Sequence, residues 1–328
     1  VSPAYIILKA TKQINPVFAE KYYLMMWMNQ VFNALGDSGV RSGLNSNELL
    51  EISLPLPSHD EQIQIADFLD EKCAEIDGIT KDLQEQIDIL EDYKKSVITE
   101  AVTKGLNKNA KMKDSGIDYI KYISKNRFIS KLKYVLKEPM KYGASESGVD
   151  YDSDLPRYIR ITDISLEGEL KDDSKLSLTN KQANGYILKN NTILFARSGA
   201  TVGKTFLYNS SYGKSAFAGY LISCVPNEGK VNPKWVYYCV NSSYYWEWCN
   251  RIFTQATIQN IGADKYSCFP LVVASIDEQN NIVKYLDNAL EKIQSVISNK
   301  KKQLNILDEY KKSLIYEYVT GKKEVKNT

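Results

Sequence analysis

The 328-residue sequence is poor in the residues that build metal sites and disulfides. It contains one histidine, His59, and five cysteines that form no Cys-x-x-Cys pair. Zinc sites need several histidine or cysteine ligands at short spacings, so this pattern argues against a zinc centre. The scattered cysteines also argue against a disulfide framework and fit a reducing compartment. We therefore expect no metal and no structural disulfide.

The sequence also lacks an apolar run of about 18 residues, which a membrane-spanning helix requires, and it shows no signal peptide. Its formal net charge of +2 is nearly neutral. Binding to nucleic acid would therefore have to come from local basic patches and not from bulk charge. These absences predict a soluble, cytoplasmic protein with no membrane association.

Catalytic groups are absent as well. Nothing resembles a hydrolytic or methyl-transfer centre, and no Gly-x-Gly-x-x-Gly cofactor loop is present. The only histidine stands where a helix is expected to begin, so it is a neighbour of the helix cap and not a general base. We predict a non-catalytic protein that needs no cofactor.

The segment Gly199–Thr205 is the one place that suggests nucleotide binding. A phosphate-binding loop needs four residues between its glycines, but here there are three, and Ser198 stands at the first glycine position. A nucleotide-dependent enzyme is one hypothesis, and a glycine-rich surface turn is another. A third is a DNA-facing loop, in which Arg197, Ser198 and Lys204 offer hydrogen-bond donors.

The chain contains one long internal repeat. Residues 60–103 align without a gap on residues 277–320, with 18 identities in 44 positions, whereas chance gives roughly one match in sixteen. The shift of 277 − 60 = 217 positions also maps the Asn-Pro pair at 15–16 onto the pair at 232–233. A repeat this much longer than 20–50 residues excludes a solenoid and predicts two lobes. The first copy has no counterpart of residues 111–215, so we expect its domain to be N-terminally incomplete.

Each copy predicts a long helix with a defined start and end. The patterns Ser58-x-x-Glu61 and Ser275-x-x-Glu278 both fit the capping box. Gly105 and Gly321 stand where a left-handed C-terminal cap is expected. Between these signals an apolar residue recurs at seven-residue spacing, as in helices that supercoil on each other. The stripe residues are Leu69, Ile76, Leu83, Leu90 and Val97 in the first copy and Leu286, Ile293, Leu307 and Leu314 in the second.

A helix of some 45 residues is a rod of roughly 65–70 Å. With one apolar face, such a rod is not stable alone in water. The simplest way to bury this face is to pack it against the helix of the other copy. Because a compact domain separates the copies in sequence, we predict an antiparallel pair, although a parallel or intermolecular pair stays open. Lys300–Lys302 interrupts the second stripe, either as a solvated face or as a contact for phosphate or a partner.

The segment between the helices predicts a mixed α+β domain that follows a polar linker at Lys113–Gly116. In the first expected strand, Ile159 and Ile161 should face the core. Tyr158, Arg160 and Thr162 should face outward. The Asn-Pro pair at 232 then begins a helix dense in aromatic residues, most of which we expect in the core. The expected strands are residues 157–164, 192–197, 204–208 and 216–225.

The order of these parts resembles the specificity subunit of type I restriction–modification systems. The resemblance covers the whole chain, and its specificity comes from the combination of local patterns. One departure is the second helix start, which lacks the second proline of the first. The patterns are Leu54-Pro55-Leu56-Pro57-Ser58-His59-Asp60-Glu61-Gln62, Lys113–Ile117, Tyr158–Ile164, and Leu194–Gly199 continuing to Gly203-Lys204.

The resemblance implies a DNA-recognition subunit without catalytic activity. In this family each target-recognition domain reads one half of a split DNA sequence, and the paired helices hold the halves apart. The helices also dock adenine methyltransferase subunits, and a restriction and translocase subunit joins them. Double-stranded DNA and these subunits are the expected partners. The implied domains are 1–57 (end of the first recognition domain), 58–110 (first helix), 111–274 (second recognition domain) and 275–328 (second helix and tail).

Polar side chains of the second recognition domain are the candidates for contact with bases or phosphates. Arginine pairs with guanine edges, and glutamine and asparagine pair with adenine edges. A coiled-coil scaffold with a protein-binding α+β domain is the alternative from another functional class. The candidate contact residues are Arg160, Thr162, Arg197, Ser198, Lys204, Gln255, Thr257, Gln259 and Asn260.

Overall fold

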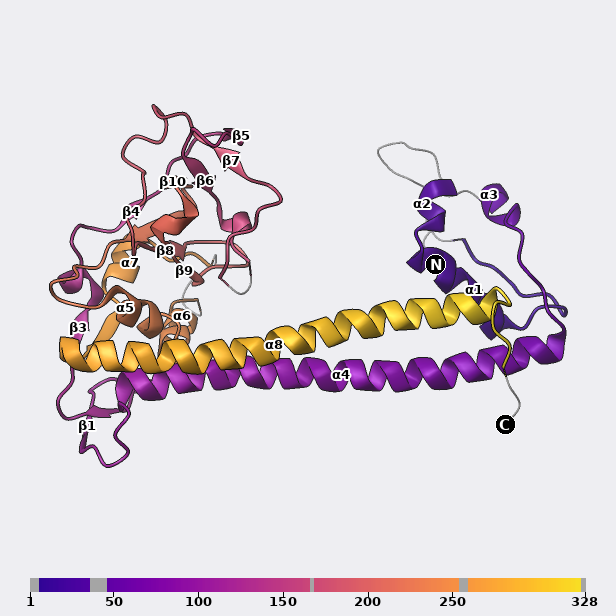
Figure 1. The fold of residues 1–328 in the computed structure, drawn as a ribbon, viewed down its shortest axis with the longest axis horizontal. Helices are drawn as coiled ribbons and strands as arrows, with labels where there is room; N and C mark the ends of the chain where they lie inside the picture. The colour runs from indigo at the N-terminus through magenta and orange to yellow at the C-terminus, as the bar shows by residue number, and fades with distance from the viewer. Residues whose placement is uncertain (1–5, 36–45, 166–167, 254–258, 326–328) are drawn as a thin grey trace. The chain divides into compact units, whose positions relative to one another are not determined.

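The computed structural model describes residues 6–35, 46–165, 168–253 and 259–325 (Figure 1). The chain divides into two compact units. Unit 1 takes residues 1–90 and 294–328, and unit 2 takes residues 91–293. Helices and separate β-sheets both occur, which confirms the predicted α+β class. The two long helices, α4 (His59–Thr103) and α8 (Ile276–Val319), each contribute residues to both units.

The described part of unit 1 is helical. Asn15 begins its first helix as predicted, because the Asn15 side chain accepts hydrogen bonds from the N–H groups of Val17 and Phe18 at 2.9 and 3.1 Å. Phe18 is buried in the same core cluster as Leu69 of α4 and Ile315 of α8. The elements of unit 1 are α1 (Pro16–Met28), α2 (Val31–Leu35), α3 (Ser46–Leu50), the first part of α4 and the last part of α8.

Within unit 1, α4 and α8 contact each other in antiparallel order. Phe68 packs on Tyr318 with ring centroids 4.6 Å apart. Nine residues further along α4, Asp77 forms a 2.6 Å ion pair with Lys311 of α8. As the position along α4 rises, the position of its partner along α8 falls, which is the antiparallel order that the sequence predicts.

The apolar stripe residues of both long helices are buried or half-buried. Lys300, at the interruption of the second stripe, donates a hydrogen bond to Gln86 of α4 and thus contacts the other helix. Both helices end as predicted, since Gly105 and Gly321 take positive φ angles of 91° and 71°.

Unit 2 combines small sheets with short helices around one main core. Its sheets have the strand orders β10-β6-β7-β5, β4-β11-β8-β9, β1-β2 and β12-β3. The strands are β1 (Met112–Asp114), β2 (Tyr122–Ser124), β3 (Phe128–Lys131), β4 (Lys141–Tyr142), β5 (Val149–Asp150), β6 (Arg157–Ile159), β7 (Leu176–Ser177), β8 (Ile193–Ala196), β9 (Thr205–Leu207), β10 (Ser215–Phe217), β11 (Leu221–Cys224) and β12 (Pro270–Val273). The helices are η1 (Leu132–Val135), η2 (Ile161–Asp163), η3 (Ser210–Tyr212), α5 (Pro233–Cys239), α6 (Ser243–Phe253) and α7 (Ala263–Ser267), together with the C-terminal part of α4 and the N-terminal part of α8.

The main core of unit 2 is rich in aromatic side chains, as the sequence predicts. Trp235 of α5 is fully buried, and its indole Nε1–H donates a 2.9 Å hydrogen bond to the carbonyl of Val272. Tyr244 and Phe269 stack with ring centroids 5.6 Å apart. Ile98 of α4 joins the same cluster, so the C-terminal end of α4 is part of this domain's core.

The prediction of one alternating strand over residues 157–164 is wrong. β6 ends at Ile159, and the chain turns into η2. Tyr158 is buried and not outward, and its hydroxyl donates to the carbonyls of Ala144 and Glu146 at 2.8 and 3.1 Å. β6 lies between β10 and β7, and all three of its residues are buried. A strand covered on both faces does not show the half-buried pattern on which the prediction depended.

Two other expected elements are each divided in the structure. The strand expected at residues 216–225 becomes β10 and β11, because the chain changes from one four-stranded sheet to the other. The single aromatic helix becomes α5 and α6. Ser242 separates them: its hydroxyl donates to the Cys239 carbonyl at 2.6 Å and accepts from the Tyr245 N–H at 3.3 Å.

The predicted capping boxes are present in their serine half. The hydroxyls of Ser58 and Ser275 accept from the N–H groups of Glu61 and Glu278 at 3.3 and 3.4 Å. The Glu278 carboxylate does not return to the helix cap. It accepts a 2.6 Å hydrogen bond from the buried Arg127 guanidinium instead, so it links two segments that are far apart in sequence.

Candidate nucleic-acid interface

The turn between β8 and β9 carries three of the predicted contact residues. β8 ends at Ala196, residues 197–204 form the turn, and the chain returns through β9. Gly199 and Gly203 take positive φ angles of 78° and 85°, which a side chain would strain. The predicted contact residues on this turn are Arg197, Ser198 and Lys204.

A second segment lies against this turn. Asn260 forms an antiparallel bridge with Ser198, and the Ile261 N–H donates a 2.9 Å hydrogen bond to the Arg197 carbonyl. On the other side, the Arg197 N–H donates to the Tyr220 carbonyl at 3.1 Å. The backbone of Arg197 is therefore fixed from two sides, and three predicted contact residues meet at one place.

The guanidinium of Arg197 is stacked on an aromatic ring. It lies 4.9 Å from the ring centroid of Tyr142 in β4, and the Arg197 Nε is buried without a hydrogen-bond partner among the described residues. The Tyr142 hydroxyl accepts a 3.0 Å hydrogen bond from the Ala263 N–H, which fixes the ring. An arginine held over a ring keeps its outer donors available to a ligand. We call Tyr142, Arg197, Ser198, Tyr220 and Asn260 the loop cluster.

The loop cluster offers the mixture of groups that nucleic acids require. The side chains of Tyr142 and Tyr220 are 43% and 64% exposed, so two aromatic faces are accessible beside a cation. Gln259 and Asn260 are exposed next to them. Arginine and asparagine can read base edges, and exposed aromatic rings can pack on bases or sugars.

The remaining candidates lie outside this cluster. The Arg160 guanidinium pairs with the buried carboxylate of Asp163 at 2.7 Å and donates to the Ser174 carbonyl at 2.7 Å. The hydrogen bond with Asp163 raises the pKa of Arg160. Thr162 is exposed on η2, and neighbouring residues of η2 line a small cavity together with Lys204. Gln255 and Thr257 lie outside the described residues.

The geometry of the 199–205 segment does not fit a nucleotide site. A phosphate loop leads into a helix and leaves its amides free for phosphate, whereas this turn leads into β9. The N–H groups of Val202, Gly203 and Lys204 already donate to backbone carbonyls within or beside the turn. The nucleotide-enzyme hypothesis is therefore wrong for this segment.

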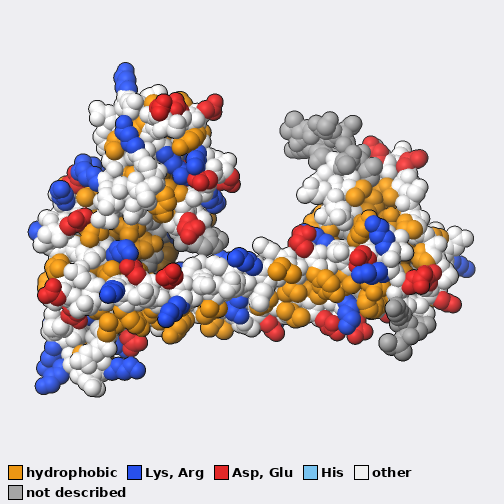
Figure 2. Space-filling model, viewed as in Figure 1, with side chains coloured by type: hydrophobic (Ala, Val, Ile, Leu, Met, Phe, Trp, Pro, Cys, Tyr) orange, Lys and Arg blue, Asp and Glu red, His pale blue; other side chains and the backbone are white. Residues whose placement is uncertain are grey.

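On the face of unit 2 that Figure 2 shows, charges of both signs are mixed. Figure 2 shows Lys and Arg side chains spread over the visible face of this unit, with Asp and Glu among them. Within the described ranges, no group of three or more His, Cys, Asp and Glu side chains could hold a metal ion. Among those same residues, no helix is both long and apolar enough to cross a membrane.

The model of the family described as type I restriction modification DNA specificity domain matches residues 107–306. The chain belongs to this family. The match contains the loop cluster and the whole of the second recognition domain as the sequence delimits it. The protein is thus a DNA-recognition subunit of a type I restriction–modification system and is not itself an enzyme. The predicted family is confirmed, and the scaffold alternative is not supported.

One solved structure supports the fold, and two others are similar at lower scores. A chain solved in work on complex assembly and conformational transition of the type I R-M system is similar with a TM-score of 0.68 and 15% identity, covering 96% of this chain and 73% of that one. The HsdS subunit from Thermoanaerobacter tengcongensis matches with a TM-score of 0.44 and 15% identity, over 96% and 72% of the two chains. The S subunit from M. genitalium matches with a TM-score of 0.45 and 12% identity, over 96% and 74%. No curated protein matches the sequence of this specificity subunit.

Sequence reasoning missed the two tyrosines of the loop cluster. The sequence has 23 tyrosines, so Tyr142 and Tyr220 do not stand out. The sequence offered one signal for these positions: each tyrosine adjoins a glycine, Gly143 or Gly219, and a glycine can mark a place where two backbones approach closely. A Cβ on Gly143 would lie 2.3 Å from the Ala218 carbonyl oxygen, so the backbones approach closely at this place.

Proposed function

We propose that the second recognition domain, residues 111–274, reads one half of a split DNA sequence through the loop cluster. The observation that carries this proposal is the Arg197 guanidinium, which lies over the Tyr142 ring and is flanked by Asn260, and whose Nε has no hydrogen-bond partner among the described residues. Arginine in this state pairs with guanine O6 and N7 in the major groove, and Asn260 and Gln259 pair with adenine. Ser198 and Lys204 bind the adjoining phosphates.

Arg160 acts differently in this proposal. Its ion pair with the buried Asp163 holds η2 in place, and η2 shares a small cavity with the β8–β9 turn. Arg160 therefore stabilises η2, which lies next to the turn. Thr162 is the exposed residue of η2 and contacts DNA. Gln255 and Thr257 are further candidates for contact with DNA.

The long helices set the distance between the two half-sites. α4 and α8 have 45 and 44 residues, which corresponds to about 66–68 Å of helix. That length spans the centres of two major grooves that lie one or two helical turns apart. The segments 58–110 and 275–328 are the spacer, and 1–57 is the end of the first reading domain.

The partners follow from this division of labour. Because the specificity subunit is not itself an enzyme, a bound methyltransferase subunit has to methylate the target adenine, and for this it has to take the base out of the DNA helix. A restriction and translocase subunit completes the complex, and a cytoplasmic location belongs to the same proposal. Within the complex, only the methyltransferase subunit has to bind S-adenosylmethionine.

A selection experiment tests the two-part site. The full chain and its methyltransferase subunit are mixed with DNA duplexes that carry a randomised region, and the retained duplexes are sequenced. We expect two conserved half-sites with a fixed gap, and binding that weakens steeply with salt. Retained DNA without any conserved positions would contradict the proposal.

A deletion tests the spacer role. Removing seven residues from each long helix keeps the stripe in register and shortens the rod by about 10 Å. The gap in the selected DNA should shrink by about three base pairs, at 3.4 Å per base pair, while both half-sites stay the same. An unchanged gap would show that the helices do not set the spacing.

A further inference from the structure

Residues 53–57, which lead into α4, belong to no helix or strand. Among the described residues, no backbone hydrogen bond reaches residues 53–56. Proline occupies positions 55 and 57, which favours an extended backbone at the residue before each. In an extended chain the N–H groups point alternately to the two sides. The N–H groups of Leu54 and Leu56 therefore lie along one edge, while the prolines offer none on the other. Such a segment can pair along one edge only.

The second copy of the repeat shows what pairs with this edge. The shift of 217 positions maps residues 53–56 onto β12, which pairs antiparallel with β3. The Leu132 N–H continues this ladder by donating to the Phe269 carbonyl at 2.9 Å. Because hydrogen-bonded positions alternate in an antiparallel ladder, the next N–H groups that face β3 are those of Leu271 and Val273.

The prolines of the first copy do not block the same pairing. Pro55 stands at the position of Val272, whose carbonyl points away from β3 and accepts a 2.9 Å hydrogen bond from the Trp235 indole. Leu54 and Leu56 occupy the positions of the two residues whose N–H groups face β3. The edge that pairs in unit 2 is therefore the edge that keeps its N–H groups in unit 1.

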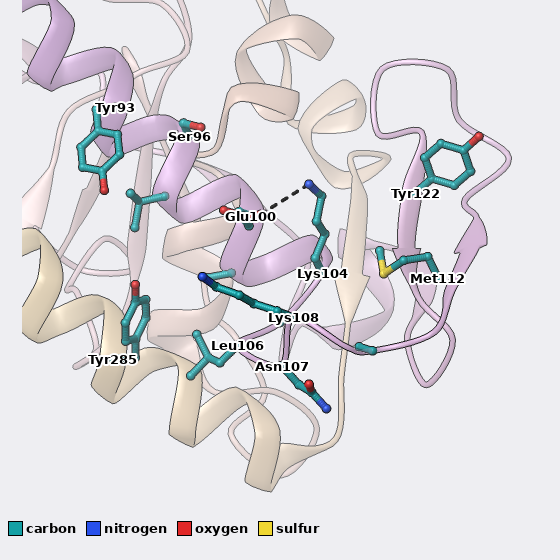
Figure 3. Close-up of a pocket in the computed structure, with 14 residues that line it drawn as sticks. Tyr93, Ser96, Glu100, Lys104, Leu106, Asn107, Lys108, Met112, Tyr122 and Tyr285 are labelled. Carbon is teal, nitrogen blue, oxygen red and sulfur yellow. Dashed lines mark hydrogen bonds and ion pairs between the residues drawn. The ribbon is translucent and has the colours of Figure 1, made fainter.

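An ion pair fixes the start of β3 in unit 2. The Glu278 carboxylate accepts hydrogen bonds from the two residues before this strand, from Arg127 Nη2 at 2.6 Å and from Asn126 Nδ2 at 2.9 Å. The guanidinium lies against the helix cap, since a Cβ on Gly105 would be 2.8 Å from Arg127 Nη2. Gly105 also lines the open groove at this end of α4 that Figure 3 shows. The arginine thus fills the space beside the cap of α4.

The corresponding place in unit 1 is accessible. Glu61 is the counterpart of Glu278, and its exposed carboxylate has no hydrogen-bond or ion-pair partner among the described residues. A Cβ on Gly321, the cap glycine of α8, would meet no atom within 4 Å outside its own surroundings in the helix. Unit 1 therefore offers an unpaired strand edge, an unpaired carboxylate and open space beside a cap. Unit 2 holds β3 and its arginine at the equivalent positions.

We propose that residues 53–56 and Glu61 bind an extended segment of a partner protein by strand addition. This segment carries an arginine directly before the added strand, as Arg127 precedes β3. Apolar side chains follow two and five positions after the arginine, because Ile129 and Leu132 pack in the core of unit 2 from those positions. Main-chain hydrogen bonds supply the affinity, and the pairing of the arginine with Glu61 fixes the register. This protein-binding surface is distinct from the loop cluster.

A peptide with the sequence of residues 125–134 is the probe, because it contains β3 and its arginine. The peptide carries a fluorophore and is titrated into the full chain, and fluorescence anisotropy gives the Kd. We expect saturable binding. Glu61→Gln should weaken it by about tenfold or more, because a charge-assisted hydrogen bond is lost. Asp60→Asn, which changes the neighbouring exposed carboxylate, should weaken it by less than about threefold. A peptide with alanine in place of the arginine should bind about tenfold more weakly.

Two proline substitutions test the strand edge itself. Leu56→Pro removes an N–H from the pairing edge and should weaken peptide binding by about tenfold or more. Ser53→Pro is the matched control, because residue 53 corresponds to Pro270, which pairs in β12 without an N–H. This control should change the Kd by less than about threefold. Both residues are exposed. If thermal unfolding shows that Leu56→Pro does not fold, Glu61→Gln and the alanine peptide decide the matter.

Hydrogen exchange locates the bound peptide. Exchange of the Leu54 and Leu56 amides should slow, and exchange in β12 should stay unchanged. A change confined to β12 would mean that the peptide displaces β3 in unit 2, and this would overturn the proposal. Equal effects of the two proline variants, or no binding up to about 1 mM peptide, would also overturn it. If sedimentation shows that the chain associates with itself and Leu56→Pro abolishes this, the occupant is a second copy and the partner assignment is wrong.

Discussion

The backbone N–H of Asn232 donates a 2.8 Å hydrogen bond to the side-chain Oε1 of Gln279, and this side chain is fully buried. The same contact occurs in the other copy of the repeat, where the Asn15 N–H donates to Gln62 Oε1 at 2.7 Å. Each glutamine thus ties the start of an Asn-Pro helix to the start of a long helix. This shared contact gives a physical reason for the glutamine at the same place in both copies.

Gln279→Leu should lower the free energy of unfolding by about 2 kcal/mol. The substitution leaves the Asn232 N–H without its acceptor, and it removes the 2.8 Å hydrogen bond from Gln279 Nε2 to the Ala274 carbonyl. Urea denaturation of the full chain measures the change. Gln303→Leu is the control, because Gln303 is exposed on the same helix and should change stability by less than about 0.5 kcal/mol. Equal effects of the two variants would contradict this explanation.

Arg127 and Glu278 form a second tie, between the end of α4 and the start of α8. The Arg127 side chain is fully buried, donates to the Ala101 carbonyl at 2.9 Å and pairs with Glu278 at 2.6 Å. Glu278→Ala should cost about 3 kcal/mol, because it leaves a buried cation without its partner. A double-mutant cycle with Arg127→Met measures the coupling. The double variant should be more stable than Glu278→Ala alone, and a double variant that is less stable would refute this account.

The cysteines should differ sharply in reactivity. Burial raises the pKa of Cys239 and of Cys249 to about 12, so both are neutral thiols at pH 8 and poor nucleophiles. Cys73 and Cys224 are also buried, whereas Cys268 is exposed. A thiol reagent at pH 8 should modify one cysteine rapidly in the folded chain and all five in denaturant. Rapid modification of two or more thiols in the folded chain would contradict the buried positions.

The same shifts give stability a pH dependence. A thiol whose pKa is raised in the folded state contributes stability that is fully present below the ordinary thiol pKa of 9.0. This contribution is lost as the pH rises toward 12. The midpoint of unfolding should therefore decrease as the pH is raised from 9 to 11. Replacing Cys239 and Cys249 by alanine should reduce the size of this fall, and an unchanged fall would assign it to other groups.

Local signals predicted the helical parts of this fold well. The caps at Asn15, Asn232, Ser58 and Ser275 depend on side chains within three residues of the helix start, and such information is contained in a short window of sequence. The seven-residue apolar spacing is likewise local, and it identified residues that are buried or half-buried in both long helices.

The recognition surface could be predicted only in part, because its contacts join distant segments. Arg197 was a visible candidate, but the ring that holds it, Tyr142, lies 55 positions earlier in the sequence, and the glycine beside Tyr142 does not indicate that Arg197 is its partner. The prediction that Tyr158 points outward failed for the same reason, since all three residues of β6 are buried and Tyr158 packs in a core cluster with residues from distant segments such as Leu178 and Ala216. Topology decides such positions, and a short window does not contain it.

The most direct test of the central claim compares two arginines of unit 2 in the DNA selection. Arg197→Ala removes the cation of the loop cluster, and Arg251→Ala removes one that pairs with Asp118 and Glu247 instead. We predict that Arg197→Ala abolishes the preference for guanine at one position of one half-site and weakens binding to the selected sequence at least tenfold, while Arg251→Ala leaves every base preference intact. If Arg197→Ala keeps all base preferences, or if both variants weaken binding to all sequences equally, the loop cluster does not read DNA.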